Sequence, residues 1–292
     1  MKIPTPQDSV NLPEIFAIQN PEWLGMYPPE LLEDFAYHQA PGVSKSSMDL
    51  VHKSIDHWLN KEWQETRSLL FGTAVHAGVL QPTEFKNKVR HSRLDARSGA
   101  WKLEKEHAER DNAVLLKEDD YQQVLTAIRR VWEHPAANEL FPIGGQAEQS
   151  YFIEDPDTGV LKKCRCDFIY PEEKLIVDLK TTRSAEPDSF SSSCTKFRYD
   201  VQQAWYTDTV AHYYNTFPEE WTFKFVAVEN TPPHNVAVYS IHPDDVDAGR
   251  RMYQDDLNRL VEFYEQRGLY TGYADTDRER VIRIRRRFNG FE

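Results

Sequence analysis

Cysteine is scarce in this sequence of 292 residues, which contains only Cys164, Cys166 and Cys194. A small, odd number of cysteines argues against a disulfide framework and suits reduced thiols in the cytosol. Cys164 and Cys166 are also too few for a four-thiolate zinc or iron–sulfur site. We therefore expect these two cysteines to be ordinary strand residues.

Long hydrophobic runs are missing as well. No apolar stretch approaches the roughly 18 residues that a membrane helix needs, and the N-terminus carries no basic and apolar leader. These absences predict a soluble, cytoplasmic protein that is neither inserted in a membrane nor secreted. There is no internal repeat, and with 40% hydrophobic residues the chain can form one large α/β domain or two small ones.

Positive charge is in deficit, because the formal net charge is −12. Non-specific affinity for nucleic acid comes from neutralising phosphates, so the negative net charge argues against non-specific binding to nucleic acid. It does not exclude a local basic groove. The densest basic cluster comprises Arg278, Arg280, Arg283, Arg285, Arg286 and Arg287. Its alternating pattern fits a solvated edge strand and a DNA contact equally well.

Two acidic residues carry the clearest chemical signal: Asp167 and, eleven residues later, Asp178 in the triplet Asp178-Leu-Lys180. Two β-rich runs, 160–170 and 175–180, flank a short polar turn with a proline, which predicts a β-hairpin. Side chains alternate faces along a strand, so Asp178 and Lys180 share one face. The hairpin can bring Asp167 opposite the Asp178 region.

Two converging carboxylates suit a hard divalent cation such as Mg²⁺, which keeps waters that a phosphate oxygen can replace. Lys180 could hold a nucleophilic water there or offset charge that develops on phosphorus. An isolated Asp-x-Lys triplet is most often an exposed cross-strand ion pair. Here, however, the apolar run 175–179 indicates burial, where charges are costly unless paired or bound to metal. This context favours a metal-dependent phosphodiesterase.

Four further candidates each leave a structural alternative open. His76 lies in a predicted helix rich in small residues, and it is either a core histidine or a metal or phosphate ligand. Glu148, on or at the start of a predicted strand, is either a solvated strand-end residue or a third metal-site carboxylate. Gln202 and Tyr206 are four apart and share a helix face, as an ordinary surface or as a pair that orients a phosphate or a water.

The remaining patterns predict the organisation of the chain. Residues 1–43, rich in proline and polar groups, are expected to form an irregular N-terminal arm, followed by a domain over 44–274 and a basic segment over 275–292. The charged stretch 85–112 is either a loop or a helix over the mouth of the site. The other predicted elements are helices over 44–59, capped by Ser46 or Ser47, 69–80, 118–133, 199–214 and 243–266, and strands over 146–154, 160–170, 175–180, 221–229 and 235–241.

In their order along the chain, the motifs resemble those of a known family. They are Val43-Ser-Lys-Ser46, Gly72-Thr-Ala-Val-His76, Glu148-Gln-Ser150, Arg165-Cys-Asp167, Asp178-Leu-Lys-Thr-Thr182, Tyr199-Asp-Val-Gln202 with Tyr206, Val228-Glu-Asn-Thr-Pro-Pro233 and Gly272-Tyr273. The chain resembles the RecE-type exonuclease VIII family of phage and prophage recombination nucleases, within the PD-(D/E)XK superfamily. This resemblance implies a three-layer α/β core, with a central mixed sheet flanked by helices.

The resemblance also implies roles for the candidate residues. These are Asp167, Asp178 and His76 as Mg²⁺ ligands, Lys180 as the catalytic lysine, Glu148 as a supporting carboxylate, and Gln202 and Tyr206 as the motif downstream of the lysine. Mn²⁺ is expected to substitute for Mg²⁺. The sequence departs from the usual pattern at Cys166, where proline is common, and at Asp200, where histidine is frequent, but neither position is an implied ligand.

The implied activity is a Mg²⁺-dependent 5′-to-3′ exonuclease that degrades one strand of linear duplex DNA to 5′-mononucleotides. It leaves a 3′ single-stranded overhang for recombination by strand annealing. Family members form rings, so we expect a homo-oligomer, with a tetramer favoured over a trimer. The expected partners are double-stranded DNA ends and a RecT-like or Redβ-like single-strand annealing protein. Two alternatives stay open: an endonuclease or repair nuclease of the same fold, and a non-catalytic DNA-binding module.

Overall fold

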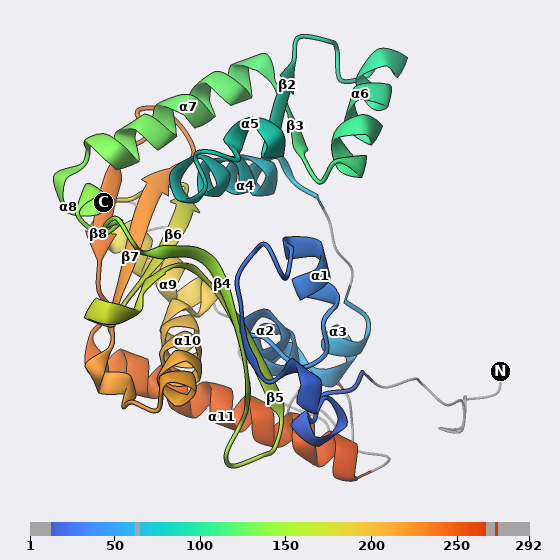
Figure 1. The fold of residues 1–292 in the computed structure, drawn as a ribbon, viewed down its shortest axis with the longest axis vertical. Coiled ribbons are helices and arrows are strands. Elements are labelled where there is room, and N and C mark those ends of the chain that lie inside the picture. The colour runs from blue at the N-terminus through green and yellow to red at the C-terminus, as the bar shows by residue number, and fades with distance from the viewer. Residues whose placement is uncertain (1–12, 62–64, 267–271, 274–292) are drawn as a thin grey trace, which may run out of the picture.

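A mixed β-sheet forms the centre of the protein in the computed structural model, which describes residues 13–61, 65–266 and 272–273 (Figure 1). The strands are β1 (Gly25–Tyr27), β2 (Val89–Ser92), β3 (Val114–Lys117), β4 (Gln146–Glu154), β5 (Leu161–Tyr170), β6 (Leu175–Thr182), β7 (Thr222–Glu229) and β8 (Val236–Tyr239). Six of them form the central sheet in the order β1-β4-β5-β6-β7-β8. β4, β5 and β6 are antiparallel neighbours, whereas β6 and β7 run parallel.

Helices cover both faces of this sheet. They are α1 (Asp34–Gln39), α2 (Lys45–Lys53), α3 (Ile55–Leu59), α4 (Arg67–Leu80), α5 (Phe85–Lys88), α6 (Gly99–Arg110), α7 (Glu118–Glu133), α8 (Pro135–Asn138), α9 (Pro187–Phe197), α10 (Tyr199–Tyr214) and α11 (Pro243–Glu265), with short 3₁₀ helices at Ala17–Gln19, Pro21–Trp23, Pro171–Glu173 and Pro218–Glu220. α10 lies against β4 and β5, with α11 and α2 packed on it, while α4 and α7 cover the other face. The predicted three-layer architecture, a central mixed sheet flanked by helices, is confirmed.

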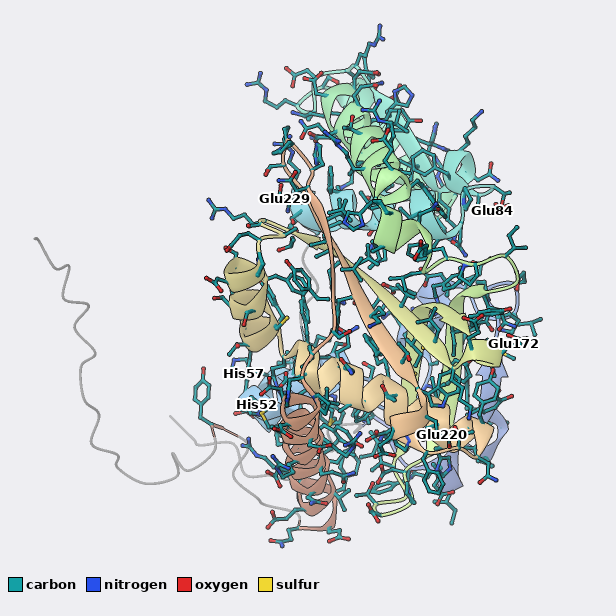
Figure 2. The ribbon with its side chains drawn as sticks, turned by 90° about the vertical axis from the view of Figure 1, so that its left-hand side faces the viewer. His52, His57, Glu84, Glu172, Glu220 and Glu229 are labelled. Carbon is teal, nitrogen blue, oxygen red and sulfur yellow. The ribbon has the colours of Figure 1, made fainter. Side chains whose placement is uncertain are left out.

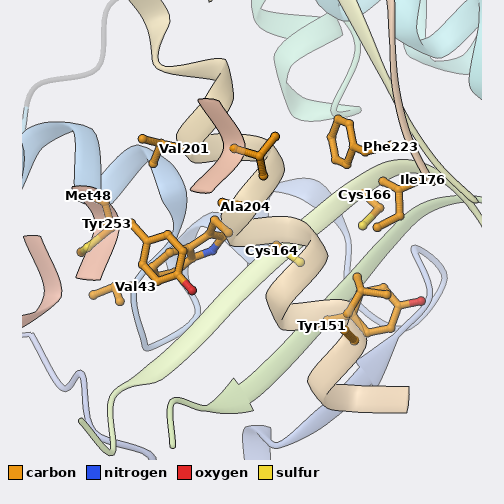
Figure 3. Packing of buried hydrophobic residues seen from close by; sticks show 14 of the residues in the cluster. Val43, Met48, Tyr151, Cys164, Cys166, Ile176, Val201, Ala204, Phe223 and Tyr253 are labelled. Carbon is orange, nitrogen blue, oxygen red and sulfur yellow. The ribbon is translucent and has the colours of Figure 1, made fainter. Parts of the chain in front are cut away.

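Alternation along β6 divides its side chains between two hydrophobic cores. Ile176 lies in the core between the sheet and α10, where Figure 3 shows it beside Cys166. Leu175, Val177 and Leu179 lie in the core on the side of α4 and α7. Successive side chains of a strand point to opposite faces of the sheet, and this alternation predicts the division between the two cores. Each fully buried side chain of this size stabilises the fold by about 1.5–3 kcal/mol.

The strand prediction for the two neighbouring cysteines is confirmed. Cys164 and Cys166 are free thiols on β5, fully buried in the same core as Ala204 of α10 (Figure 3). The next residue of α10, Trp205, donates its indole N–H to the backbone carbonyl of Lys163 at 3.0 Å. Apolar packing and a hydrogen bond therefore fix α10 on β5.

Most predicted elements agree with the structure, but the helix predicted over 44–59 needs correction. It is divided into α2 and α3, because Ser54 is extended and its side chain caps α3 by accepting the His57 N–H. The predicted cap is also wrong. Ser44, rather than Ser46 or Ser47, caps α2, and its side chain accepts the Ser47 N–H.

The charged stretch 85–112, which the sequence leaves open, folds as α5, β2 and α6. β2 pairs in parallel with β3, and this small sheet lies beyond α4 and α5 at the upper edge of the molecule in Figure 1. α9 was not predicted, because its serine-rich sequence carries a weak helix signal. It begins with Pro187 after Glu186, whose side chain accepts the Ser189 N–H.

Residues 13–43 join the fold, in contrast to the irregular arm expected for 1–43. β1 pairs antiparallel with β4, and Ile15, Leu32 and Tyr37 are buried. The carbonyls of Tyr37 and Ala40 accept hydrogen bonds from the buried ammonium of Lys163 at 2.9 and 2.5 Å. The proline-rich sequence does not reveal these contacts, because their partners lie 126 and 123 residues further along the chain.

No helix among the described residues is long and apolar enough to cross a membrane. The predicted basic segment over 275–292, with its arginines from Arg278 to Arg287, lies outside the described residues. The domain boundary after residue 274 therefore stays a prediction.

Candidate active site

β5 and β6 are paired at one end and apart at the other. Phe168–Tyr170 pair with Leu175–Val177, but from Asp178 onward β6 pairs with β7 alone. The backbone N–H of Leu179 is thus available, and it donates to Asp167 Oδ2 at 2.8 Å. We call this point of separation, with Asp167 on one strand and Asp178 on the other, the fork.

A local irregularity in β4 brings Glu148 to the fork. Ala147 pairs with Phe168 and Gln149 with Cys166, but Glu148 and the facing Asp167 interrupt the ladder. Glu148 has a left-handed backbone with φ of 55°, which is costly for a residue other than glycine and typical of places where a side chain is redirected. Glu148 is close enough to His76 for its charge to act on the imidazole.

The Asp178 carboxylate is almost fully buried, with 1% of the residue exposed. Its Oδ1 accepts a short hydrogen bond from Gln202 Nε2, and Lys180 Nζ lies 2.6 Å from its Oδ2. The Lys180 ammonium is the partner of Oδ2 among the described residues. Burial raises the pKa of Asp178 to about 6; Lys180 opposes this rise, and the charge of Asp167 adds to it. A cation at the fork would relieve both unfavourable effects.

Lys180 lies between the carboxylates and an aromatic ring. Its Nζ is 4.9 Å from the centre of the Tyr199 ring. Burial disfavours the charged form, but the charges of Asp178 and Asp167 outweigh burial and raise the pKa of Lys180. Lys180 is therefore a cation at neutral pH, suited to stabilising negative charge rather than to accepting a proton.

His76 reaches the fork from α4. Its Nδ1 lies 2.9 Å from the carbonyl oxygen of Gly72 and its Nε2 3.1 Å from Asp167 Oδ2. A carbonyl only accepts hydrogen bonds, so Nδ1 carries a proton and the ring orientation is fixed. Burial lowers the pKa of His76, but Asp167 outweighs burial, and the pKa is raised to about 9. Small residues allow this approach, since a Cβ on Gly72 would lie 3.0 Å from Thr181 Oγ1.

The structure brings most predicted site residues together. His76, Asp167, Asp178, Lys180 and Gln202 form one network around the fork, and Glu148 lies beside it. Tyr206 differs. It lies one turn after Gln202 on α10, its ring centroid is 6.4 Å from that of Phe223, and no hydrogen bond joins its hydroxyl to any described residue. Burial raises the pKa of Tyr206 and the charges of Asp178 and Asp167 add to the rise, so Tyr206 lies within electrostatic range of the fork.

Two participants at the fork were not predicted. Tyr199 stands three residues before Gln202, so both lie on one side of α10, and this helical spacing could have revealed its contact with Lys180. The Leu179 N–H binds Asp167 because β5 and β6 separate, and the sequence carries no signal for that separation.

The side chains at the fork fit a hard divalent cation. Two carboxylates from neighbouring strands supply oxygen ligands and one imidazole supplies a nitrogen ligand, and Asp178 is a buried carboxylate whose pKa is raised by burial and by the charge of Asp167. No three such side chains in the described part of the chain already surround a single point. His76 and Lys180 lie against the carboxylate oxygens instead, so a bound cation would replace the His76 proton and the Lys180 contact.

Two solved structures provide a comparison of the fold. A crystal structure from Eubacterium rectale, described as a "Putative exonuclease", has a TM-score of 0.55 and 16% sequence identity, covering 83% of this chain and 90% of that one. This likeness concerns the fold alone. The structure of SSO0001 has a TM-score of 0.28 and 15% identity, covering 73% of this chain and 86% of that one, a score too low to indicate a common fold.

Sequence comparison identifies a family. None of the curated proteins matches the chain. Residues 45–272 match the PDDEXK-like domain of unknown function DUF3799. The matched region includes every predicted site residue, from His76 to Tyr206. The chain therefore belongs to the DUF3799 family of PDDEXK-like domains, within the PD-(D/E)XK nuclease superfamily.

Proposed function

We propose that the protein is a Mg²⁺-dependent 5′-to-3′ exonuclease of double-stranded DNA. It releases 5′-mononucleotides and leaves 3′ overhangs for recombination by strand annealing. The observation that carries this proposal is the fork, where Asp167, Asp178 and Lys180 converge with His76. Family membership supports a nuclease, and the name of the structural neighbour agrees with an exonuclease.

Asp167, Asp178 and His76 would hold the metal, for which Mn²⁺ is expected to substitute. Bound Mg²⁺ would polarise the scissile phosphate and lower the pKa of a water. Lys180, a cation at neutral pH, stabilises the negative charge that develops on the phosphoryl group. One such preorganised group contributes about 10²–10³-fold to the rate. Water attacks phosphorus in line and the 3′-oxygen leaves, which gives 5′-phosphate products.

Three groups orient the proposed ligands. The Gln202 amide donates to Asp178, the Leu179 N–H donates to Asp167, and the Gly72 carbonyl accepts from His76. Contacts of this kind keep ligands in position and tune their basicity. We assign Glu148 a supporting role beside His76 and Tyr206 a packing role, because its hydroxyl makes no hydrogen bond to a described residue.

The proposal extends to assembly and partners. We propose a homo-oligomeric ring, a tetramer rather than a trimer, that encloses a linear DNA end. A ring would hold DNA beside the active sites of a chain whose formal net charge is −12. A RecT-like or Redβ-like annealing protein would take up the exposed strand. The support for these points is the resemblance of the motifs between Val43 and Tyr273.

Digestion of 5′-end-labelled linear duplex beside closed circular DNA, with Mg²⁺ and with chelator, tests this function. We expect loss of the 5′ label from linear DNA only, and only with Mg²⁺. Nicked circles would indicate an endonuclease or repair nuclease instead. Earlier loss of a 3′ label would reverse the polarity. Binding of DNA without metal-dependent cleavage would contradict the proposal in favour of a non-catalytic binding module.

A further inference from the structure

A single residue joins the two helices that border the active site. α9 ends at Phe197 and α10 begins at Tyr199, so Arg198 is the C-cap of the first and the N-cap of the second. Its backbone is left-handed, with φ of 55° and ψ of 53°, a conformation that glycine adopts readily and arginine rarely. Contacts outside the junction must therefore hold Arg198 in this conformation.

The guanidinium group provides these contacts. Nη1 donates to the Met48 carbonyl and to Asp49 Oδ1 on α2, both at 3.3 Å, and Nη2 donates to Asp256 Oδ2 on α11 at 2.6 Å. Only 11% of the Arg198 side chain and 7% of the Asp256 side chain are exposed. The other Asp256 oxygen lies 3.1 Å from Nδ1 of His52, labelled beside α11 in Figure 2. A planar guanidinium can bridge two helices in this way, whereas a single ammonium is a point charge.

Lys45 on α2 reinforces the same junction. Its Nζ donates to the Phe197 carbonyl at 2.5 Å and to Asp49 Oδ2 at 2.7 Å. Asp49 therefore binds both Lys45 and Arg198, and α2 holds the last residue of α9 together with the junction residue itself.

The first turn of α10 carries two residues of the active site. The Tyr199 ring lies 4.9 Å from Lys180 Nζ, and the Gln202 side chain donates to Asp178. The Gln202 backbone N–H donates in turn to the Arg198 carbonyl at 3.1 Å. A displaced junction would therefore move Tyr199 and Gln202 away from the fork while leaving every proposed metal ligand in the chain.

We propose that Arg198 is a positioning residue of the active site. By tying the junction to α2 and α11, it holds Gln202 and Tyr199 against the Asp178–Lys180 pair. Arg198 acts through these residues and is not itself catalytic. The inference rests on the proposed nuclease for its kinetic readout, and it has a separate readout in the binding of Mg²⁺ without DNA.

Two variants of Arg198 distinguish the effect of its backbone conformation from the effect of its guanidinium contacts. Arg198→Gly keeps the left-handed conformation accessible and removes the guanidinium contacts, whereas Arg198→Lys keeps the charge without the bridge. Arg250→Lys is the matched control. Arg250 also ties α11 to α10, through Asp208 at 2.8 and 2.9 Å, but it does so six residues beyond Gln202.

For each protein we would measure Mg²⁺ affinity by calorimetry, kcat and KM on linear DNA, and the unfolding temperature. Both Arg198 variants should lose roughly 10- to 100-fold in Mg²⁺ affinity and in kcat, with KM within about twofold, as for other groups that orient a metal ligand. Arg250→Lys should lower the unfolding temperature and leave Mg²⁺ affinity and kcat unchanged.

Arg198 variants that bind Mg²⁺ and turn over DNA like the wild type, whatever their unfolding temperature, would overturn the inference. If the wild type binds Mg²⁺ but cleaves no DNA, the nuclease proposal fails, and the Mg²⁺ affinities still decide the role of Arg198. A wild type that binds no Mg²⁺ overturns both.

Discussion

The two ends of the β5–β6 hairpin differ in strand pairing and in the polarity of their side chains. Near the turn, Phe168–Tyr170 pair with Leu175–Val177, and the side chains there are mostly apolar and buried. At the fork the strands separate, and Asp167, Asp178 and Lys180 gather in their place. Apolar burial stabilises a fold, whereas buried like charges destabilise it. The paired end thus supplies stability to a neighbouring end that holds the buried charges of the proposed metal site.

Replacement of Lys180 should produce the largest functional effect. Lys180→Ala removes the cation at the fork and should lower kcat by about 10²–10³-fold while the fold is kept. The measurement is nucleotide release from linear duplex DNA at saturating Mg²⁺, with circular dichroism as a check on folding. The control is Lys174→Asn in the turn of the same hairpin, where Lys174 is left-handed and asparagine tolerates that backbone, and its activity should be unchanged. A Lys180→Ala protein as active as the wild type would contradict the assignment.

A substitution at the paired end should have the converse effect. Ile176 is fully buried between the sheet and α10, so Ile176→Ala should lower the free energy of unfolding by about 2–5 kcal/mol. The kcat of the folded fraction should remain close to that of the wild type. Denaturant unfolding and kinetics on the same samples provide the measurement. Loss of kcat without loss of stability would remove the distinction between the two ends.

The stabilising effect of Mg²⁺ should depend on pH. Protons compete with the metal at Asp178, whose pKa is raised to about 6, and at His76, whose pKa is raised to about 9. Mg²⁺ should therefore stabilise least below pH 6 and progressively more up to about pH 9, reaching about 2.7 kcal/mol at a concentration of 100 Kd. Thermal unfolding with Mg²⁺ or chelator across this range is the test. Asp178→Asn should show little stabilisation at any pH, and an equal stabilisation in this variant would refute the ligand assignment.

Substitutions of two residues on one face of α10 should differ in their effect on kcat. Gln202→Ala removes the donor to Asp178 and should lower kcat roughly 10- to 100-fold. Tyr206→Phe removes a hydroxyl that makes no hydrogen bond to a described residue, so kcat should stay within about twofold. The measurement is the steady-state kinetics of both variants on linear duplex DNA, determined in parallel. A loss in Tyr206→Phe equal to that in Gln202→Ala would show that the hydroxyl takes part in catalysis.

The features that the sequence predicts well are local in origin. The turn between the strands sets the register that places Asp167 opposite Asp178, and the spacing of apolar residues on one helix face predicts α7. The small residues of α4 also indicated how His76 could approach a neighbour closely.

The features that escaped prediction depend on distant segments. Arg198 and Asp49 lie 149 positions apart in the sequence, and Lys163 and the Tyr37 carbonyl that it binds lie 126 positions apart. The separation of β5 from β6 and the left-handed backbone of Glu148 arise from packing in the whole sheet, and no local pattern encodes them. The sequence does not predict α9 for a different reason: serine is a weak helix former, and the burial of Phe190 that stabilises this helix is a tertiary contact.

The proposed function makes the fork a metal-dependent nuclease centre. The most direct test compares nucleotide release from linear duplex DNA by the wild type and by Asp178→Asn, with Mg²⁺, after chelation and after Mg²⁺ is restored. We predict release by the wild type that stops with chelator and resumes with Mg²⁺, and no release by the variant, although it folds. Equal release by the two proteins, or release that persists in chelator, would contradict the claim.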